Sequence, residues 1–302
     1  MPTRRLATQS GTPLDWFRPV DRSPRVFVRS SSSRSPSSNV WIQRQRNDPF
    51  VRKRQSTLDP NTSFVSRSAF KLLELHDSHS PPANGPKLLR PGMAIVDLGA
   101  APGGWIQAAQ HVLEGRGTVV GVDLLPLQRG IGHLDGVRFV RGDFLDPRVQ
   151  GKVRQAIADA TGKRTSHVDL VLSDMMANTT GSSIRDADLS LTLCESALAF
   201  ALESLSPSSG QQRPDAATSA TTPSLPIQFV TKHFASHYTT EFQARLRRYF
   251  NLVKWVKPES SRKQSKEGFF VCSGLKARSE WPQEERKPAG NEAEPGDDDL
   301  YF

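Results

Sequence analysis

Cysteine and long apolar runs are both scarce in this sequence. Only Cys194 and Cys272 occur, and each lies alone in an apolar segment. Two isolated cysteines supply neither a disulfide framework nor a CxxC metal site, so we expect a reducing or redox-neutral compartment and no bound metal. No stretch approaches the roughly 18 apolar residues of a membrane span, so we expect no membrane-spanning segment.

Charge is distributed unevenly along the 302 residues, whose formal net charge is +9. Residues 1–46 contain nine arginines, nine serines and two acidic residues but no lysine, whereas residues 276–302 contain four basic and eight acidic residues. The segment between them has only a mild basic excess. The net charge alone is therefore weak evidence for a nucleic-acid partner.

The composition of residues 1–46, rich in arginine and serine and poor in acids, is typical of a mitochondrial transit peptide. The alternative is a disordered basic arm that contacts RNA directly. We expect a mitochondrial matrix protein with one folded domain over residues 47–275. A disordered acidic tail is expected over residues 276–302.

Short apolar runs alternate with helical patterns inside the expected domain, which is typical of βαβ units on a parallel sheet. Seven strands are predicted, over residues 94–98, 118–123, 137–141, 168–173, 226–231, 251–256 and 268–273. Helices are predicted over residues 65–76, 104–114, 148–160, 188–205 and 239–249. The low-complexity residues 206–226 are predicted to be a surface insertion.

The segment DLGAAPGGW, residues 97–105, follows the first predicted strand and opens a helix. Its small residues let the backbone approach a ligand at the carboxyl end of that strand. The segment breaks the G-x-G-x-x-G dinucleotide fingerprint, and Pro102 removes an amide that a pyrophosphate would use. We therefore predict S-adenosylmethionine as the ligand. The predicted contacts are Pro102, Gly103, Gly104 and Trp105.

Two acids follow the next predicted strands. Asp123 ends the second strand, where its carboxylate can accept both ribose hydroxyls of a nucleoside. Asp143 follows the third strand, where it can accept from an adenine amino group while Phe144 flanks the ring. A single acid at a strand end usually caps a helix or turn. In combination with the glycine-rich loop, however, the two acids indicate a nucleoside site.

The motifs DLGAAPGGW, VDLLP, GDF, LSDM and SRSAFKL resemble those of the FtsJ-type (RrmJ-like) ribosomal RNA 2′-O-ribose methyltransferases. The resemblance covers residues 47–275. It implies a Rossmann-like, seven-stranded α/β fold that uses S-adenosylmethionine, with a mostly parallel sheet and an antiparallel last strand. It also implies a Lys-Asp-Lys-Glu tetrad, which this sequence fills with Lys71, Asp174, Lys232 and Glu267. The loop after Asp174 reads DMMAN and lacks the proline that family members often have.

A ribose 2′-hydroxyl is a poor nucleophile, so an enzyme must align it with the methyl group and remove its proton. A lysine accepts that proton when its pKa falls from about 10.4 toward about 7–8, and a second lysine nearby lowers it. We assign Lys232 as the general base. Asp174 is expected to orient it and to lie beside the methyl donor, while Lys71 and Glu267 position the base and the ribose.

Basic clusters near the predicted site are expected to contact RNA phosphates without reading sequence. They comprise Arg52, Lys53, Arg54, Arg67, Lys71, Arg262, Lys263 and Lys266. The candidates for stacking on a base are Phe64, Phe234 and Tyr238.

With its Arg/Ser-rich start, the sequence is most similar to the mitochondrial, fungal-type members of the family. Those members methylate a uridine ribose in the peptidyl-transferase region of the mitochondrial large-subunit rRNA. The expected partner is therefore that rRNA or a pre-ribosomal particle, and we expect a monomer. The alternatives are the same chemistry on tRNA or mRNA caps, or a ribosome-assembly factor without turnover. An NAD-dependent oxidoreductase is disfavoured by the broken fingerprint.

Overall fold

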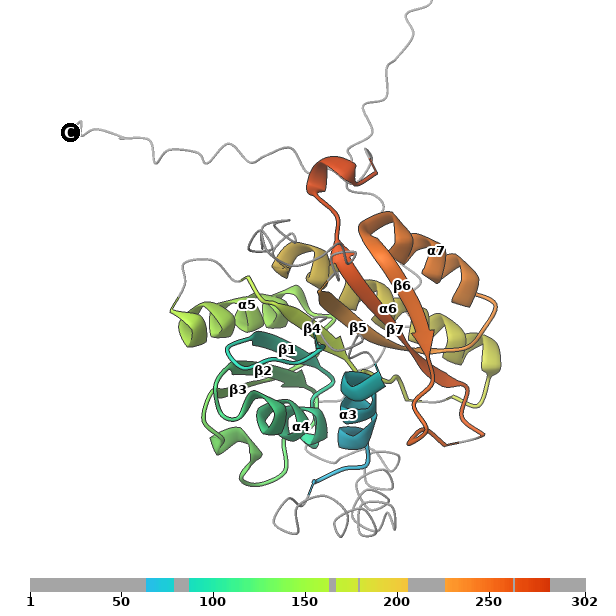
Figure 1. Cartoon of the computed structure of the whole chain (residues 1–302). Helices are drawn as coiled ribbons and strands as arrows, with labels where there is room; N and C mark the ends of the chain where they lie inside the picture. Colours follow the sequence, from blue (N-terminus) through green and yellow to red (C-terminus); the bar gives the residue numbers. More distant parts are fainter. Residues whose placement is uncertain are drawn as a thin grey trace, which may run out of the picture.

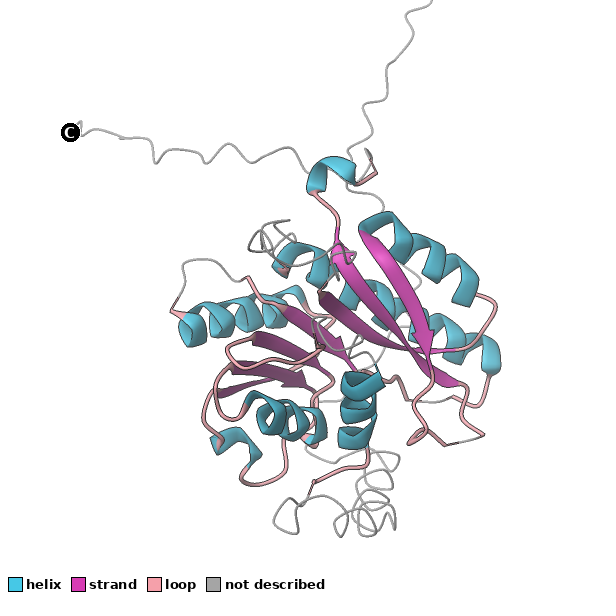
Figure 2. Ribbon diagram, viewed as in Figure 1, coloured by secondary structure: helices cyan, strands magenta, loops and turns pink. Residues whose placement is uncertain are grey.

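The computed structural model describes residues 64–78, 87–162, 167–178, 180–205, 226–262 and 264–282 (Figures 1 and 2). Several predictions concern segments outside these residues. They are the transit peptide, the basic cluster at residues 52–54, Lys263, the insertion up to residue 225 and the tail from residue 283 onward.

A seven-stranded sheet forms the centre of the domain, in the order β3-β2-β1-β4-β5-β7-β6. The strands are β1 Ala94–Leu98, β2 Thr118–Asp123, β3 Val137–Arg141, β4 Leu170–Ser173, β5 Ile227–Phe234, β6 Phe250–Val256 and β7 Glu267–Leu275. The first five strands pair in parallel, and β7 runs antiparallel to both β5 and β6. The predicted fold class, including the antiparallel last strand, is confirmed.

Helices cover both faces of this sheet (Figure 2). They are α3 Ser68–Ser78, α4 Gly104–Leu113, α5 Pro147–Thr161, α6 Ser183–Ser204 and α7 Thr239–Tyr249, with short 3-10 turns η1 Ile131–His133 and η2 Arg278–Glu280. Alternate residues of β1 contribute to the two cores, since Val96 packs with residues of α5, α6 and α7 and Ile95 with residues of α3 and α4. Burial on both faces explains why this strand reads as an almost continuous apolar run.

Several other element boundaries shift by one to three residues from the predictions, and three differences affect the description of the domain and its site. Strand β5 continues to Phe234, so Lys232 lies within the strand rather than at its end. Helix α6 begins at Ser183, five residues before its predicted start at residue 188. The domain also continues past residue 275, because Trp281 is buried against Tyr249, with ring centroids 5.5 Å apart. A single tryptophan in an otherwise charged segment supplies enough apolar surface to anchor it.

Candidate active site

The loop between β1 and α4 lies at the carboxyl edge of the sheet and is closely enclosed by protein. Gly99 has a φ of +84°, and a Cβ there would lie 2.8 Å from the Met175 backbone. Gly103 has a φ of +113°, and a Cβ would lie 2.6 Å from the Ile131 side chain. Both positions therefore require glycine. The Ala101 amide donates to Asp123 Oδ2 over 2.9 Å, which ties the loop to the end of β2.

Trp105 and Gly104, two of the predicted cofactor contacts, also pack against the residues around the start of α3. The Trp105 side chain is buried, its Nε1 donates to the Ser68 carbonyl over 2.8 Å, and its ring lies 5.6 Å from that of Phe269. A Cβ on Gly104 would lie 2.0 Å from Ser66 Oγ. These residues thus join α4 to the start of α3. Pro102, in contrast, remains in the loop, where its carbonyl accepts from the Gln128 amide over 2.9 Å.

Asp123 is held so that its carboxylate faces the loop. Oδ2 accepts from the Ala101 amide, and Oδ1 accepts from the Leu125 amide over 2.8 Å. Burial raises the pKa of this carboxyl, and the backbone hydrogen bonds oppose that shift. Each oxygen can accept a second hydrogen bond, as the two hydroxyls of a ribose would require.

Asp143 and Phe144, which follow β3, differ in their exposure to solvent. Asp143 is exposed, and its Oδ1 accepts from the Leu145 amide over 2.9 Å. Phe144 is buried, with its ring edge-on to Phe200 at 5.4 Å. The prediction that the Phe144 ring flanks an adenine is therefore wrong, because the ring belongs to the core beneath α6. Asp143 stays in a position to contact a nucleoside.

Asp97 is a candidate site residue to which sequence reasoning assigned no role. Its side chain is fully buried in β1, and neither carboxylate oxygen has a hydrogen-bond partner among the described residues. Burial raises its pKa well above the ordinary value, and the nearby Asp174 and Asp123 add to the shift. The signal was an acid inside the apolar run AIVDL. A buried carboxylate without a partner fits a ligand that carries positive charge, as S-adenosylmethionine does.

The four tetrad residues form two ion pairs. Lys232 Nζ lies 2.9 Å from Asp174 Oδ1 and also donates to the Asp174 carbonyl over 2.6 Å. Lys71 Nζ lies 2.9 Å from Glu267 Oε1. The Lys232 and Asp174 side chains are 5% and 15% exposed, and both side chains of the other pair are 11% exposed. Ion pairs so poorly solvated are much less screened than surface pairs.

Strand pairing places the two ion pairs close together. Lys232 is opposite Phe269 in the β5–β7 ladder, and Phe234 is opposite Glu267. Residues that are opposite each other, or two apart on one strand, point to the same face. Lys71 Nζ also lies 5.9 Å from the Phe269 ring. Helix α3, the residue after β4, and strands β5 and β7 thus bring the four residues to one edge of the sheet.

A buried cysteine and histidine support the strand behind Lys232. Cys194 Sγ donates to the Lys232 carbonyl over 3.0 Å and lies 3.7 Å from His233 Nδ1. His233 Nε2 is 3.1 Å from Thr239 Oγ1. Burial raises the pKa of Cys194 to about 12 and lowers that of His233 to about 4, so both are neutral near pH 7. The sequence signalled only an isolated cysteine in an apolar helix.

The residues predicted to contact RNA differ in accessibility. Arg262 and Lys266 are exposed at the start of the β7 segment, whereas the Arg67 Nε donates to the Ser260 carbonyl over 2.9 Å. Phe64 is buried with its ring edge-on to Phe70, so its proposed stacking role is wrong. The Tyr238 hydroxyl donates to Asp188 Oδ1 over 2.6 Å. Phe234 is half-buried.

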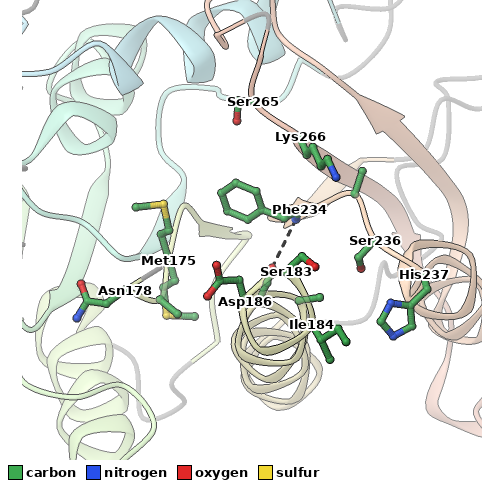
Figure 3. Close-up of a pocket in the computed structure, with 15 residues that line it drawn as sticks. Met175, Asn178, Ser183, Ile184, Asp186, Phe234, Ser236, His237, Ser265 and Lys266 are labelled. Carbon is green, nitrogen blue, oxygen red and sulfur yellow. Dashed lines mark hydrogen bonds between the residues drawn. The ribbon is translucent and has the colours of Figure 1, made fainter. Parts of the chain in front are cut away.

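Phe234 lines a cavity of about 450 Å³ beside the tetrad (Figure 3). Its walls come from the segment after β4, the first turns of α6, the end of β5 and the residues just before β7.

The described residues include no group of three or more His, Cys, Asp or Glu that could hold a metal ion. No helix in the described ranges is long and apolar enough to cross a membrane.

Comparisons with known proteins agree with this architecture. "Ribosomal RNA large subunit methyltransferase E" of Rhodopseudomonas palustris strain TIE-1 is 36% identical over 255 residues, covering 83% of this chain and 90% of the relative. The protein of the same name from Rickettsia africae is 35% identical over 260 residues, covering 84% and 96%.

A solved structure shares the fold. The crystal structure of a Plasmodium falciparum protein assigned as a ribosomal RNA methyltransferase has a TM-score of 0.52 at 21% identity, covering 70% of this chain and 97% of that chain. The FtsJ-like methyltransferase family matches residues 64–275. On this match and these identities, the chain belongs to the FtsJ-like methyltransferase family and is an S-adenosylmethionine-dependent enzyme.

Proposed function

We propose that this enzyme methylates a ribose 2′-hydroxyl of the mitochondrial large-subunit rRNA, at a uridine in the peptidyl-transferase region. The observation that carries the proposal is the pair of buried ion pairs, Lys232–Asp174 and Lys71–Glu267, at the same strand edge as Asp123. The names of the curated relatives support large-subunit rRNA as the substrate. The choice of uridine rests on the family resemblance of the motifs.

Lys232 is the general base in this proposal. S-adenosylmethionine, when bound, would supply a methyl group that its positively charged sulfonium sulfur activates. The Lys232 amine takes up the 2′-hydroxyl proton at Nζ. Asp174 contacts Nζ through both its carboxylate and its carbonyl, so it fixes the position of the amine and balances the charge that the proton brings.

Lys71 and Glu267 position the ribose. Their contact of 2.9 Å presents a hydrogen-bond donor and an acceptor side by side, which suits the hydroxyl groups of a sugar. The limited exposure of all four side chains keeps water away from the transferring proton. Alignment of the hydroxyl with the methyl group and removal of its proton are together sufficient for this reaction.

The test is transfer of a labelled methyl group from S-adenosylmethionine to three RNAs in parallel. They are mitochondrial large-subunit rRNA, both naked and in assembled ribosomal particles, a tRNA pool and capped mRNA. Products are mapped by ribose-methylation sequencing. We expect label on one rRNA uridine with wild-type enzyme. Label on tRNA or caps would instead identify the alternative substrates. No label on naked rRNA or on assembled ribosomal particles, with the cofactor still bound, would favour an assembly factor without turnover.

We also propose that residues 1–46 direct the protein to the mitochondrial matrix. With nine arginines and only two acidic residues, this segment is positively charged, which supports import driven by the mitochondrial membrane potential. A fluorescent reporter fused after residue 46 is expected to enter mitochondria, and a version with the arginines replaced by glutamine is expected to stay outside. Uniform distribution of the first reporter would contradict targeting and favour the alternative of an RNA-binding arm.

A further inference from the structure

The cavity beside the tetrad has a size and position that the methyl-transfer chemistry leaves unexplained. Its volume of about 450 Å³ falls within the range of small-molecule sites, which is about 300–1,000 Å³. Met175 in its wall directly follows Asp174, and Lys266 directly precedes Glu267. Phe234 in the same wall is opposite Glu267 in the β5–β7 ladder. Residues of the cavity wall are therefore direct neighbours of tetrad residues, in the chain or across the β5–β7 pair.

The walls combine an apolar interior with polar groups at the rim. Met175, Ile184 and Phe234 contribute apolar surface, and Figure 3 shows the Phe234 ring pointing into the space between Met175 and the start of α6. Asn178 at the rim is exposed and carries an amide that can both donate and accept. Lys266 adds a positive charge to the same rim. This mixture fits a flat heteroaromatic ring attached to a phosphate-bearing chain.

Asp186 closes the α6 side of the cavity and has a structural task there. Its Oδ1 accepts from the Thr180 amide over 2.7 Å and from the Thr180 hydroxyl over 2.8 Å. These hydrogen bonds lower the pKa of the carboxyl, so it stays ionised at neutral pH. The carboxylate thereby fixes the segment between β4 and α6, to which Asn178 belongs.

The geometry of β5 relates the cavity to the reacting hydroxyl. Lys232 and Phe234 lie two residues apart on one strand, about 7 Å along its axis, and point to the same face. This separation is comparable with the reach from a ribose hydroxyl to the ring of its own base. A ribose held at Lys232 would therefore place its base against Phe234. Enzymes that act on one nucleotide of a folded RNA or DNA commonly extrude it into such a pocket.

We propose that this cavity receives the base of the target nucleotide, everted from the RNA, with its face on Phe234 and its polar edge toward Asn178. The inference rests on the proposed function, because it requires that the tetrad act on a ribose. Lys266 contacts the phosphate next to the everted nucleotide. Binding of the base in the pocket keeps the 2′-hydroxyl of the ribose next to Lys232, so base binding contributes directly to the rate.

A cycle of enzyme and RNA changes tests the proposal. The RNA carries either the native base or an abasic ribose, with its 2′-hydroxyl intact, at the position mapped for wild-type enzyme. Phe234→Ala is expected to lower kcat/KM for native RNA by about 5- to 100-fold, the range for loss of one base–aromatic stack. The abasic RNA is expected to lower kcat/KM of wild-type enzyme by at least as much. On abasic RNA the two enzymes should react equally fast.

A second measurement does not depend on turnover. An RNA with a 2′-deoxyribose at the target position keeps its base but cannot be methylated. Phe234→Ala is expected to weaken binding of this RNA by a similar factor, whereas Phe234→Tyr keeps the stacking face and wild-type affinity. S-adenosylmethionine affinity and the melting temperature should match wild type in both variants. Leu252→Ala, an exposed apolar position on β6, is the control and should leave every value unchanged.

The outcomes separate this inference from the proposed function. If Phe234→Ala and the abasic RNA reduce kcat/KM by independent factors that multiply, Phe234 does not contact the base and the inference is overturned. If Phe234→Ala reacts and binds RNA like wild type, the inference is likewise overturned. If wild-type enzyme methylates no ribose in any RNA, the proposed function fails and the base pocket fails with it.

Discussion

The strand edge has two halves whose polar groups are held in different ways. In the acidic half, formed by the ends of β1, β2 and β3, Asp123 and Asp143 accept hydrogen bonds from backbone amides, and Asp97 has no partner among the described residues. In the lysine half, formed by the ends of β4 and β5 and the start of β7, side chains pair with side chains, as Lys232 does with Asp174.

This difference matches the task of each half. Fixed backbone donors leave the carboxylates of the acidic half free to accept hydroxyl groups and positive charge from a bound cofactor. In the lysine half, each charge is balanced by an opposite charge within the protein. The acidic half is thus suited to binding and the lysine half to proton transfer. Substitutions in the two halves should therefore change different observables.

The largest expected effect is on the rate, through Lys232→Ala. Removal of the base is expected to lower methyl transfer by about 10³-fold, within the range for general base catalysis. S-adenosylmethionine affinity should stay within a few-fold, because Lys232 is not proposed to contact the cofactor. Labelled methyl transfer gives the rate, and calorimetry gives the affinity. Lys254→Ala, an exposed lysine on β6, is the matched control. Retained turnover in Lys232→Ala would remove the base assignment.

The next effect belongs to the acidic half. Asp123→Ala should weaken S-adenosylmethionine binding by about 1.5–3 kcal/mol, the scale of hydrogen bonds to a charged group. Asp135→Ala changes a carboxylate outside the strand edge and should leave the affinity unchanged. Calorimetry of both variants without RNA isolates the cofactor step. Unchanged affinity in Asp123→Ala would mean that the carboxylate only holds the loop at Ala101.

The smallest effect is on stability, through Asp97. Its pKa is raised in the folded protein, so the folded state binds more protons than the unfolded state as pH rises above 3.8. Stability is then lost progressively between pH 3.8 and the raised pKa. Asp97→Asn removes the titrating carboxyl and with it this pH-dependent loss of stability. The variant should therefore stabilise the cofactor-free protein by about 1 kcal/mol at pH 7, which is the scale of a single stabilising substitution.

Two measurements check the Asp97 prediction. Thermal melting between pH 4 and pH 8 should show a flatter profile for Asp97→Asn than for wild type. The same variant should bind S-adenosylmethionine more weakly, since it lacks the carboxylate that we expect to face the positively charged ligand. A variant that is less stable at pH 7, or that binds as tightly as wild type, would contradict this assignment of Asp97 to the cofactor site.

Local sequence predicted most of the secondary structure. The bounds of β1, β2, β3 and α7 agree with their predicted ranges, because each is a patterned run with polar or small residues at its ends. The glycine-rich loop and Asp123 were likewise recognisable from consecutive residues. The lysine half was found only through the family resemblance. Lys232 and Asp174 are 58 residues apart, and no local pattern indicates that they meet.

The errors concern the direction of side chains. Phe64 and Phe144 were expected at the ligand or RNA surface, yet both rings are buried. An aromatic residue beside a strand end or helix start can point to the core or to the ligand, and its identity suits both. Trp281 was assigned to a solvated tail because the residues around it are charged. In each case, whether the side chain is buried depends on residues that are distant in sequence but adjacent in the fold.

Local residue patterns were sufficient to predict the fold class, the seven strands and the residue types at the strand ends, because backbone patterning and glycine requirements are local properties. Three features became visible only in the folded domain. They are the buried carboxylate without a hydrogen-bond partner among the described residues, the pairing of the four tetrad residues, and the cavity beside them. These features depend on strand order and register between segments far apart in the chain. Packing of the whole domain sets that order, since no short segment can bury its apolar surface alone.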